Sequence, residues 1–259
     1  MRILLTGSEG YVGKALRHDL SREHDVTCIN RKVVDLTDQR LVNRWFDDHS
    51  SFDVVVHAAA VGGNRLIKDT WATMDANLQM HYNLMHNRNH YARLLTFGSG
   101  AEIFQPDSPY GLAKRAIANS VRETDNMHNL RIFAVFDENE LDRRFIKANL
   151  LRYIHKEPMT IHSNKVMDFI YMKDLVSIVR HFIVAESPPR EINCSYREKA
   201  SLLDIAEFIN CLSDHRCFVD CKGQQTEAYS GDGHGLSLPM IGLYQGIRET
   251  YKFLLSSTQ

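Results

Sequence analysis

Tyr110 and Lys114 are the residues whose types and spacing are best suited to chemistry. They are four positions apart in a segment with a helical pattern, so one helix face carries both side chains. A phenol has a pKa near ~10, but an ammonium one turn away stabilises the phenolate and lowers that pKa. Ser99 upstream is a hydroxyl that can orient a substrate oxygen. The three residues together form a device that moves a proton to or from a carbinol or a ketone.

The first thirteen residues predict the element that brings a cofactor to this device. An apolar run at 3–5 is followed by three glycines and a helical pattern, which indicates a buried strand, a tight turn and a helix start. The helix N-terminus offers N–H groups and a partial positive charge to phosphates. A nicotinamide bound there moves the hydride while Tyr110 moves the proton. The expected dinucleotide contacts are Gly7, Gly10, Tyr11, Val12 and Gly13.

The end of the second expected strand, at 25–30, bears on the choice between NAD and NADP. An acidic residue there holds the ribose 2′-hydroxyl of NAD, whereas a basic residue accommodates the 2′-phosphate of NADP. This chain has Asn30 followed by Arg31 and Lys32, and Arg31 can fork onto a phosphate. NADP is therefore favoured. Glu9 in the glycine loop can point toward the same ribose, which keeps NAD open.

Four motifs in order carry a resemblance to a known family. They are the glycine loop behind Thr6, the His-Ala-Ala-Ala run at 57–60, Gly-Ser-Gly at 98–100, and Tyr-Gly-Leu-Ala-Lys at 110–114. The chain resembles the extended short-chain dehydrogenase/reductase superfamily (the NAD-dependent epimerase/dehydratase family). Within it, the chain is similar to the GDP-fucose synthase-like reductases and epimerases of nucleotide sugars. The resemblance is strong to about residue 120 and looser afterwards.

The resemblance implies a fold, a domain division and further site residues. The implied fold is α/β, a Rossmann-type doubly wound parallel sheet with a small C-terminal substrate lobe. The NAD(P)-binding domain is expected at 1–131 with 168–194, and the substrate-binding lobe at 132–167 with 195–259. The family's pattern adds cofactor contacts at Asp35, Leu36, Ala58, Ala59, Ala60 and Asn77, besides Tyr110 and Lys114.

Departures from the family's pattern reduce the number of reactions that the chain is expected to catalyse. Gly100 stands where the extended branch usually has its hydroxyl, so Ser99 is the nearest substitute. Ala101 before Glu102 removes the Asp of the dehydratases, and the absence of a Cys in this loop argues against double epimerisation. Ketone reduction or epimerisation at one carbon remains, on a substrate expected to be a nucleotide sugar. The alternative is a catalytically silent dinucleotide-binding sensor or scaffold. One reason for this alternative is Met167, which stands where the family has an Arg.

Composition excludes other classes of partner. The chain has 259 residues and a net charge of −1, which predicts neither a nucleic-acid nor a membrane partner. It begins directly with a strand pattern and has an odd number of cysteines, so we expect a cytoplasmic protein with reduced thiols. The group Cys211, Cys217 and Cys221 around His215 lacks zinc spacing, so buried packing is expected there and no metal. Family members suggest a homodimer formed through the helices expected at 71–91 and 110–123.

Local patterns place the remaining elements. Strands are expected at 52–60, 93–97, 130–136 and 191–195. Helices are expected from near Gln39 with Thr37 or Asp38 as the cap, at 174–185, at 201–212 behind a cap, and around 246–251.

Overall fold

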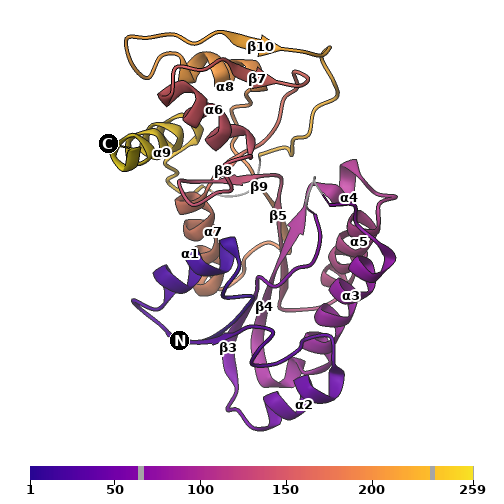
Figure 1. Cartoon of the computed structure of the whole chain (residues 1–259). Coiled ribbons are helices and arrows are strands. Elements are labelled where there is room, and N and C mark those ends of the chain that lie inside the picture. Colours follow the sequence, from indigo (N-terminus) through magenta and orange to yellow (C-terminus); the bar gives the residue numbers. More distant parts are fainter. Residues whose placement is uncertain (64–66, 234–236, 259) are drawn as a thin grey trace. The chain divides into compact units, whose positions relative to one another are not determined.

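The computed structural model describes residues 1–63, 67–233 and 237–258. The chain divides into two compact units (Figure 1). The first unit comprises Met1–Arg131 and Val179–Ile192, and the second comprises Ile132–Ile178 and Asn193–Gln259. Every residue that the sequence suggested for chemistry or for cofactor binding belongs to the first unit.

A six-stranded sheet organises the first unit. Its strand order is β2-β1-β3-β4-β5-β9. β1 pairs in parallel with both β2 and β3, and β3 pairs in parallel with β4. The order reverses beside β1, so the carboxyl ends of β1 and β3 form the crevice where such sheets bind ligands. The strands are β1 Arg2–Thr6, β2 Asp25–Ile29, β3 Phe52–His57, β4 Tyr91–Ser99, β5 Met127–Ile132 and β9 Glu191–Cys194.

Helices cover both faces of this sheet, as the predicted doubly wound fold requires. α1 lies on one side, and α2, α3 and α5 lie on the other (Figure 1). Asp38 caps α2 as expected, because its carboxylate accepts the N–H groups of Arg40 and Leu41. The α/β prediction is therefore confirmed. The helices are α1 Tyr11–Leu20, α2 Gln39–Asp47, α3 Trp71–His86, the short α4 Ala101–Phe104, and α5 Pro109–Arg122, with a 3₁₀ turn at Arg88–His90.

The central strands read as apolar runs because both of their faces are buried. Ile3, Leu5, Val55 and Leu95 have less than 1% of their surface exposed. This leaves the strand ends as the place where polar side chains of the sheet reach a ligand. We therefore expect the functional side chains in the loops that follow β1, β3 and β4.

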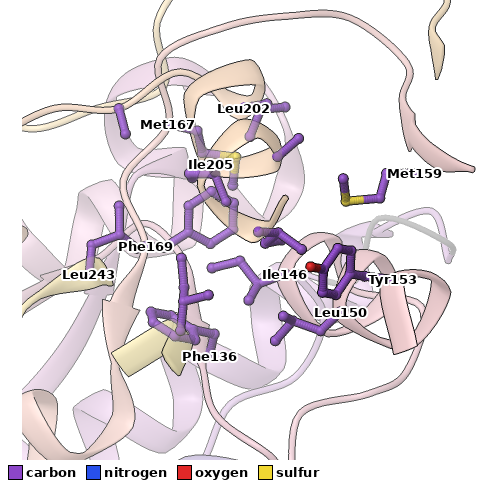
Figure 2. Close-up of a cluster of buried hydrophobic side chains, with 14 of the residues drawn as sticks. Phe136, Ile146, Leu150, Tyr153, Met159, Met167, Phe169, Leu202, Ile205 and Leu243 are labelled. Atoms are coloured by element: carbon purple, nitrogen blue, oxygen red, sulfur yellow. The ribbon is translucent and has the colours of Figure 1, made fainter. Parts of the chain in front are cut away.

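The second unit has its own apolar core (Figure 2). Phe136 of β6, Ile146 and Tyr153 of α6, Ile205 of α8 and Leu243 of α9 converge there, and all are buried. Each element is too short to fold alone, so packing of these side chains holds the unit together. Its elements are β6 Val135–Phe136, α6 Phe145–Ile154, β7 Met159–Ile161, β8 Ile170–Tyr171, α7 Met172–Val184, α8 Leu202–Ile209, β10 Val219–Cys221 and α9 Leu243–Thr258, with α7 ending in the first unit.

Several element predictions need correction. The strand expected at 52–60 ends at His57, and the three alanines follow it as a loop. The strand expected at 130–136 is two strands, β5 and β6. The helix expected at 71–91 ends at His86, since Tyr91 already starts β4. All five cysteines are free thiols, but Cys211 and Cys221 are exposed, so the expected burial holds only for Cys217 of that group. Across the described residues, none of the helices combines the length and the apolar character that a membrane crossing needs.

Candidate functional site

The glycine loop after β1 is built by close approach of backbones. Gly7 has a φ of +65°, and a Cβ there would lie 2.5 Å from the Ala59 nitrogen. A Cβ on Gly13 would lie 2.1 Å from the Gly7 carbonyl oxygen. The Gly10 N–H donates to that same oxygen at 2.9 Å. Side chains larger than hydrogen are therefore excluded at Gly7 and Gly13 by neighbouring backbone.

The same loop leaves room for a phosphate group. Gly10 is the N-cap of α1 and offers no side chain to the first-turn N–H groups. A Cβ on Gly10 would find only the Gly7 oxygen nearby, at 3.3 Å, and otherwise open space. An uncapped helix N-terminus beside open space suits an anion, so these residues fit the pyrophosphate of a dinucleotide. Tyr11, Val12 and Gly13 form the first turn whose N–H groups face that space.

Basic and acidic groups are paired around the expected adenine ribose. The Arg31 guanidinium lies 3.4 Å from the Asp35 carboxylate, and 83% of its side chain is exposed. Hydrogen bonds from the Thr37 N–H and hydroxyl, and then the charge of Arg31, hold the pKa of Asp35 below its usual value. Glu9 pairs with Arg17 of α1 at 2.5 Å. The Glu9 carboxylate, which was the argument for NAD, is therefore already bound to Arg17.

Leu36 and Asn77 are both buried, and only Asn77 contacts the loop after β3. Leu36 is 7% exposed and belongs to the apolar core of the first unit. Asn77 is buried in α3, where its side chain accepts the Val61 N–H at 3.1 Å and donates to the Val61 carbonyl at 2.8 Å. Both amide groups of Asn77 thus hold the loop that follows Ala58, Ala59 and Ala60.

Tyr110 lies in the first turn of α5, where the helix dipole favours a negative phenolate. Ser108 caps this helix by accepting the Gly111 N–H at 3.0 Å. The Lys114 ammonium lies 5.7 Å from the centre of the Tyr110 ring. Gly63 lies against the ring, since a Cβ there would be 2.8 Å from the Tyr110 Cζ. The structure therefore brings the phenol and the ammonium together on one helix face, beside the loop after β3.

Lys114 is buried, with 5% of its surface exposed. Its ammonium donates to the Phe97 carbonyl of β4 at 2.7 Å. Burial lowers the pKa of Lys114 to about 8, and the negative charge of Glu102 opposes that shift. At neutral pH the side chain is therefore a proton-bearing cation whose charge is poorly screened.

Two buried histidines beside Lys114 escaped the sequence reasoning. A 2.8 Å hydrogen bond joins His57 Nδ1 to the Thr6 hydroxyl, and His81 Nε2 lies 2.6 Å from the Ser120 hydroxyl. Burial, and then the charges of His81 and Lys114, hold the pKa of His57 well below its usual value. Burial and Lys114 lower the pKa of His81 to about 4. Both rings are neutral near pH 7, and the signal available in the sequence was His57 closing an apolar strand.

Ser99 ends β4 with its hydroxyl oriented by the next turn. Its Oγ accepts the Ala101 N–H at 3.1 Å, and its own N–H donates to the Glu102 carboxylate at 2.8 Å. The serine hydroxyl retains its proton for a further acceptor. A Cβ on Gly111 would lie 2.8 Å from the Ala101 carbonyl, so the Ser99 turn adjoins the start of α5. Among the described residues, no three His, Cys, Asp or Glu side chains gather as a metal site.

Comparisons with known proteins agree with this geometry. Residues 3–195 match the sequence model of the NAD dependent epimerase/dehydratase family. The GDP-L-colitose synthase of Yersinia pseudotuberculosis is 27% identical over 162 residues, which cover 61% of this chain and 48% of that protein. The match thus spans about half the length of that relative.

Solved structures show the same fold. A GDP-mannoheptose C4 reductase from Campylobacter jejuni with NADP bound superposes with a TM-score of 0.76 at 18% identity, over 98% of both chains. The UDP-glucose 4-epimerase of Thermotoga maritima with UDP-glucose gives a TM-score of 0.76 at 16% identity, over 100% of both chains. At these identities the likeness concerns the fold.

Proposed function

We propose that this chain, which belongs to the NAD dependent epimerase/dehydratase family, is an oxidoreductase that reduces or epimerises a keto group on a nucleotide sugar. The observation that carries the proposal is the buried Lys114 ammonium 5.7 Å from the Tyr110 ring, at the N-terminus of α5. The relatives named above act on GDP- or UDP-linked sugars, which supports a sugar nucleotide as the substrate class.

The proposed mechanism assigns one task to each residue. The bound nicotinamide supplies the hydride for reduction or accepts it for oxidation. Tyr110 donates its phenolic proton to the oxygen of the substrate ketone, and takes it back in the reverse direction. Lys114 stabilises the phenolate that remains, because an unscreened cation favours the charged form of its neighbour. Ser99 donates a hydrogen bond to the same substrate oxygen and orients it.

The family's cofactor is a nicotinamide dinucleotide, and NADP is the form we propose for this chain. Arg31 is exposed at the end of β2 and can turn from Asp35 to a 2′-phosphate. Glu9 is engaged by Arg17, so the NAD-selecting role of a free carboxylate has no support there. Solved structures of the same fold hold either NADP or NAD, so the choice of NADP depends on Arg31 and Glu9.

The test is a turnover assay that compares the wild type with Tyr110→Phe, a variant that lacks only the phenolic hydroxyl. Wild-type chain is incubated with NADPH and a panel of GDP- and UDP-linked sugars and keto sugars. Reduction should consume NADPH, whereas epimerisation should give a sugar of inverted configuration without net consumption of NADPH. Tyr110→Phe should lower kcat by about 10³-fold, because general acid catalysis contributes about that factor. NADPH affinity, measured by fluorescence, should stay unchanged in the variant. Tight NADPH binding by the wild type without either reduction or epimerisation of any sugar in the panel would contradict the proposal.

We also propose that the chain acts as a homodimer through α3 and α5. These two helices pack together, and Tyr82 and Trp71 of α3 are exposed large side chains. A hollow of about 610 Å³ lies over α3, lined partly by Leu78, Tyr82 and Met85. Exposed apolar side chains beside a hollow suit a second copy of the same helix pair. Sedimentation at increasing concentration tests the assembly, and a chain that remains monomeric contradicts it.

A further inference from the structure

A network of polar side chains lies beneath the Ser99 turn. Glu102 of α4 has only 5% of its surface exposed, although it is a carboxylate on a short surface helix. It accepts the Ser99 N–H at 2.8 Å on Oε1 and the Arg131 Nε–H at 2.8 Å on Oε2. The Asn129 amide donates to both oxygens at 3.4 Å. Both carboxylate oxygens are thus engaged by groups of the chain itself.

Arg131 is itself held by a second ion pair that leads to the surface. Its Nη2 donates to Glu191 of β9 at 2.7 Å, and Glu191 accepts the Arg122 Nε–H at 2.5 Å. Removing one partner of a buried pair leaves an uncompensated charge, so such a pair persists only with good geometry and additional hydrogen bonds. The chain of alternating charges fixes where the Glu102 carboxylate lies.

The Glu102 carboxylate lies in the space that a side chain at residue 98 would occupy. A Cβ at residue 98 would lie 2.3 Å from Glu102 Oε1 and 2.5 Å from Asn129 Oδ1. The absence of a side chain at Gly98 therefore lets Glu102 fold back over the end of β4 and reach the Ser99 amide. A general base must present a lone pair to its substrate, whereas this carboxylate is turned toward the backbone.

We propose that Glu102 is a positioning residue, whose carboxylate fixes the Ser99 backbone and brings a negative charge to the end of β4, where the Lys114 ammonium binds the Phe97 carbonyl. The inference rests on the proposed carbonyl chemistry of Ser99, Tyr110 and Lys114. Through the fixed backbone, the Ser99 hydroxyl keeps one orientation, with its oxygen on the Ala101 N–H and its proton left for the substrate oxygen.

The charge of Glu102 matters because, in the described part of the chain, the neighbours of Lys114 named above carry no negative charge at neutral pH. His57 of β3 and His81 of α3 are neutral there, Tyr110 lies on the same helix as Lys114, and the Phe97 carbonyl of β4 accepts its proton. Burial lowers the pKa of Lys114 to about 8, and Glu102 raises it against that effect. Loss of the carboxylate should therefore deprotonate Lys114 at lower pH.

Two substitutions separate position from charge. Glu102→Asp keeps the charge but is one methylene too short for both bonds, so kcat should fall about tenfold or more with KM unchanged, as misplaced groups do. Glu102→Gln keeps the reach but loses the charge, so the pKa of Lys114 should fall below its wild-type value. That pKa is followed by NMR of isotope-labelled lysine and assigned with Lys114→Arg. Glu123→Gln, an exposed carboxylate just after α5 and outside these ion pairs, is the control that should change neither quantity.

Unchanged kcat in Glu102→Asp, or an unmoved Lys114 pKa in Glu102→Gln, would overturn the inference. If either variant fails to fold, Gly98→Ala pushes the carboxylate from the Ser99 amide without altering any charge. It should lower kcat at constant KM, and unaltered kcat would again overturn the inference. Turnover by the wild type decides the proposed function separately, whereas the Lys114 titration needs no substrate and decides the role of the Glu102 charge in either case.

Discussion

The glycine loop after β1 and the Ser99 turn after β4 lie at the same edge of one sheet but are built differently. At Gly7 and Gly13, the space of a side chain is filled by backbone atoms of Ala59 and Gly7. At Gly98, that space is filled by the side chains of Glu102 and Asn129. Backbone is rigid and carries no net charge, whereas side chains bring charge, titration and partners. The conformation of the glycine loop is therefore limited by steric contact, whereas that of the Ser99 turn depends on charge and hydrogen bonding.

The largest effect that would test this comparison is expected at Gly13. Gly13→Ala places a methyl group 2.1 Å from the Gly7 carbonyl oxygen, and neither backbone can retreat. The free energy of unfolding should fall by about 3 kcal/mol, the upper range for overpacking, and NADPH binding should be lost. Denaturant titration and fluorescence binding measure the two quantities.

Gly10→Ala is the matched control in the same loop. Its methyl group meets the Gly7 oxygen only at 3.3 Å, so the unfolding free energy should stay within about 1 kcal/mol of wild type. NADPH affinity should still fall, because the methyl group occupies the space left for the pyrophosphate. Equal stability of Gly13→Ala and Gly10→Ala would contradict a loop that is limited by backbone contact.

An intermediate effect is expected on acidification. The pKa of His81 is about 4 in the folded chain and near 6.5 when exposed, so the unfolded chain binds more protons between these values. Stability from this group is complete above pH 6.5 and is lost as the pH falls toward 4. At pH 5 the loss amounts to about 2 kcal/mol.

His81→Gln should flatten this part of the pH dependence, as measured by denaturant unfolding between pH 4 and 8. Glutamine does not titrate and can still bond to the Ser120 hydroxyl. His86→Gln, on an exposed position of the same helix, is the control and should retain the wild-type slope. A slope that persists in His81→Gln would show that His81 is not the source of the acid sensitivity, and His57→Gln then tests the second buried ring.

The smallest effect is expected at Arg31, whose side chain would add one contact to a dinucleotide held mainly by the glycine loop. Arg31 is 83% exposed, so solvent screens its attraction for a phosphate. Arg31→Ser should weaken NADPH about tenfold, or ~1.4 kcal/mol, and leave NADH unchanged. Lys32→Ser is the neighbouring control. Equal losses of both cofactors in Arg31→Ser would remove this residue from cofactor selection.

Much of the fold followed from local pattern. Apolar runs predicted the strands of the first unit, and Asp38 predicted the start of α2. The errors arose where tertiary packing divides a run, as between β5 and β6, or where a helical pattern continues into a turn and a strand, as after His86. The roles of Glu102, His57 and His81 had no local signal of comparable strength.

The sequence by itself determined the glycine loop and the spacing of Tyr110 and Lys114, because steric exclusion and helical repeat act between residues close in the chain. Tertiary structure alone decided that Lys114 is buried, that two neutral histidines adjoin it, and that Glu102 turns inward to Arg131. Those partners come from β3, α3 and β5, far apart in sequence. Their charges depend on burial and distance in space, which no short pattern of residues encodes.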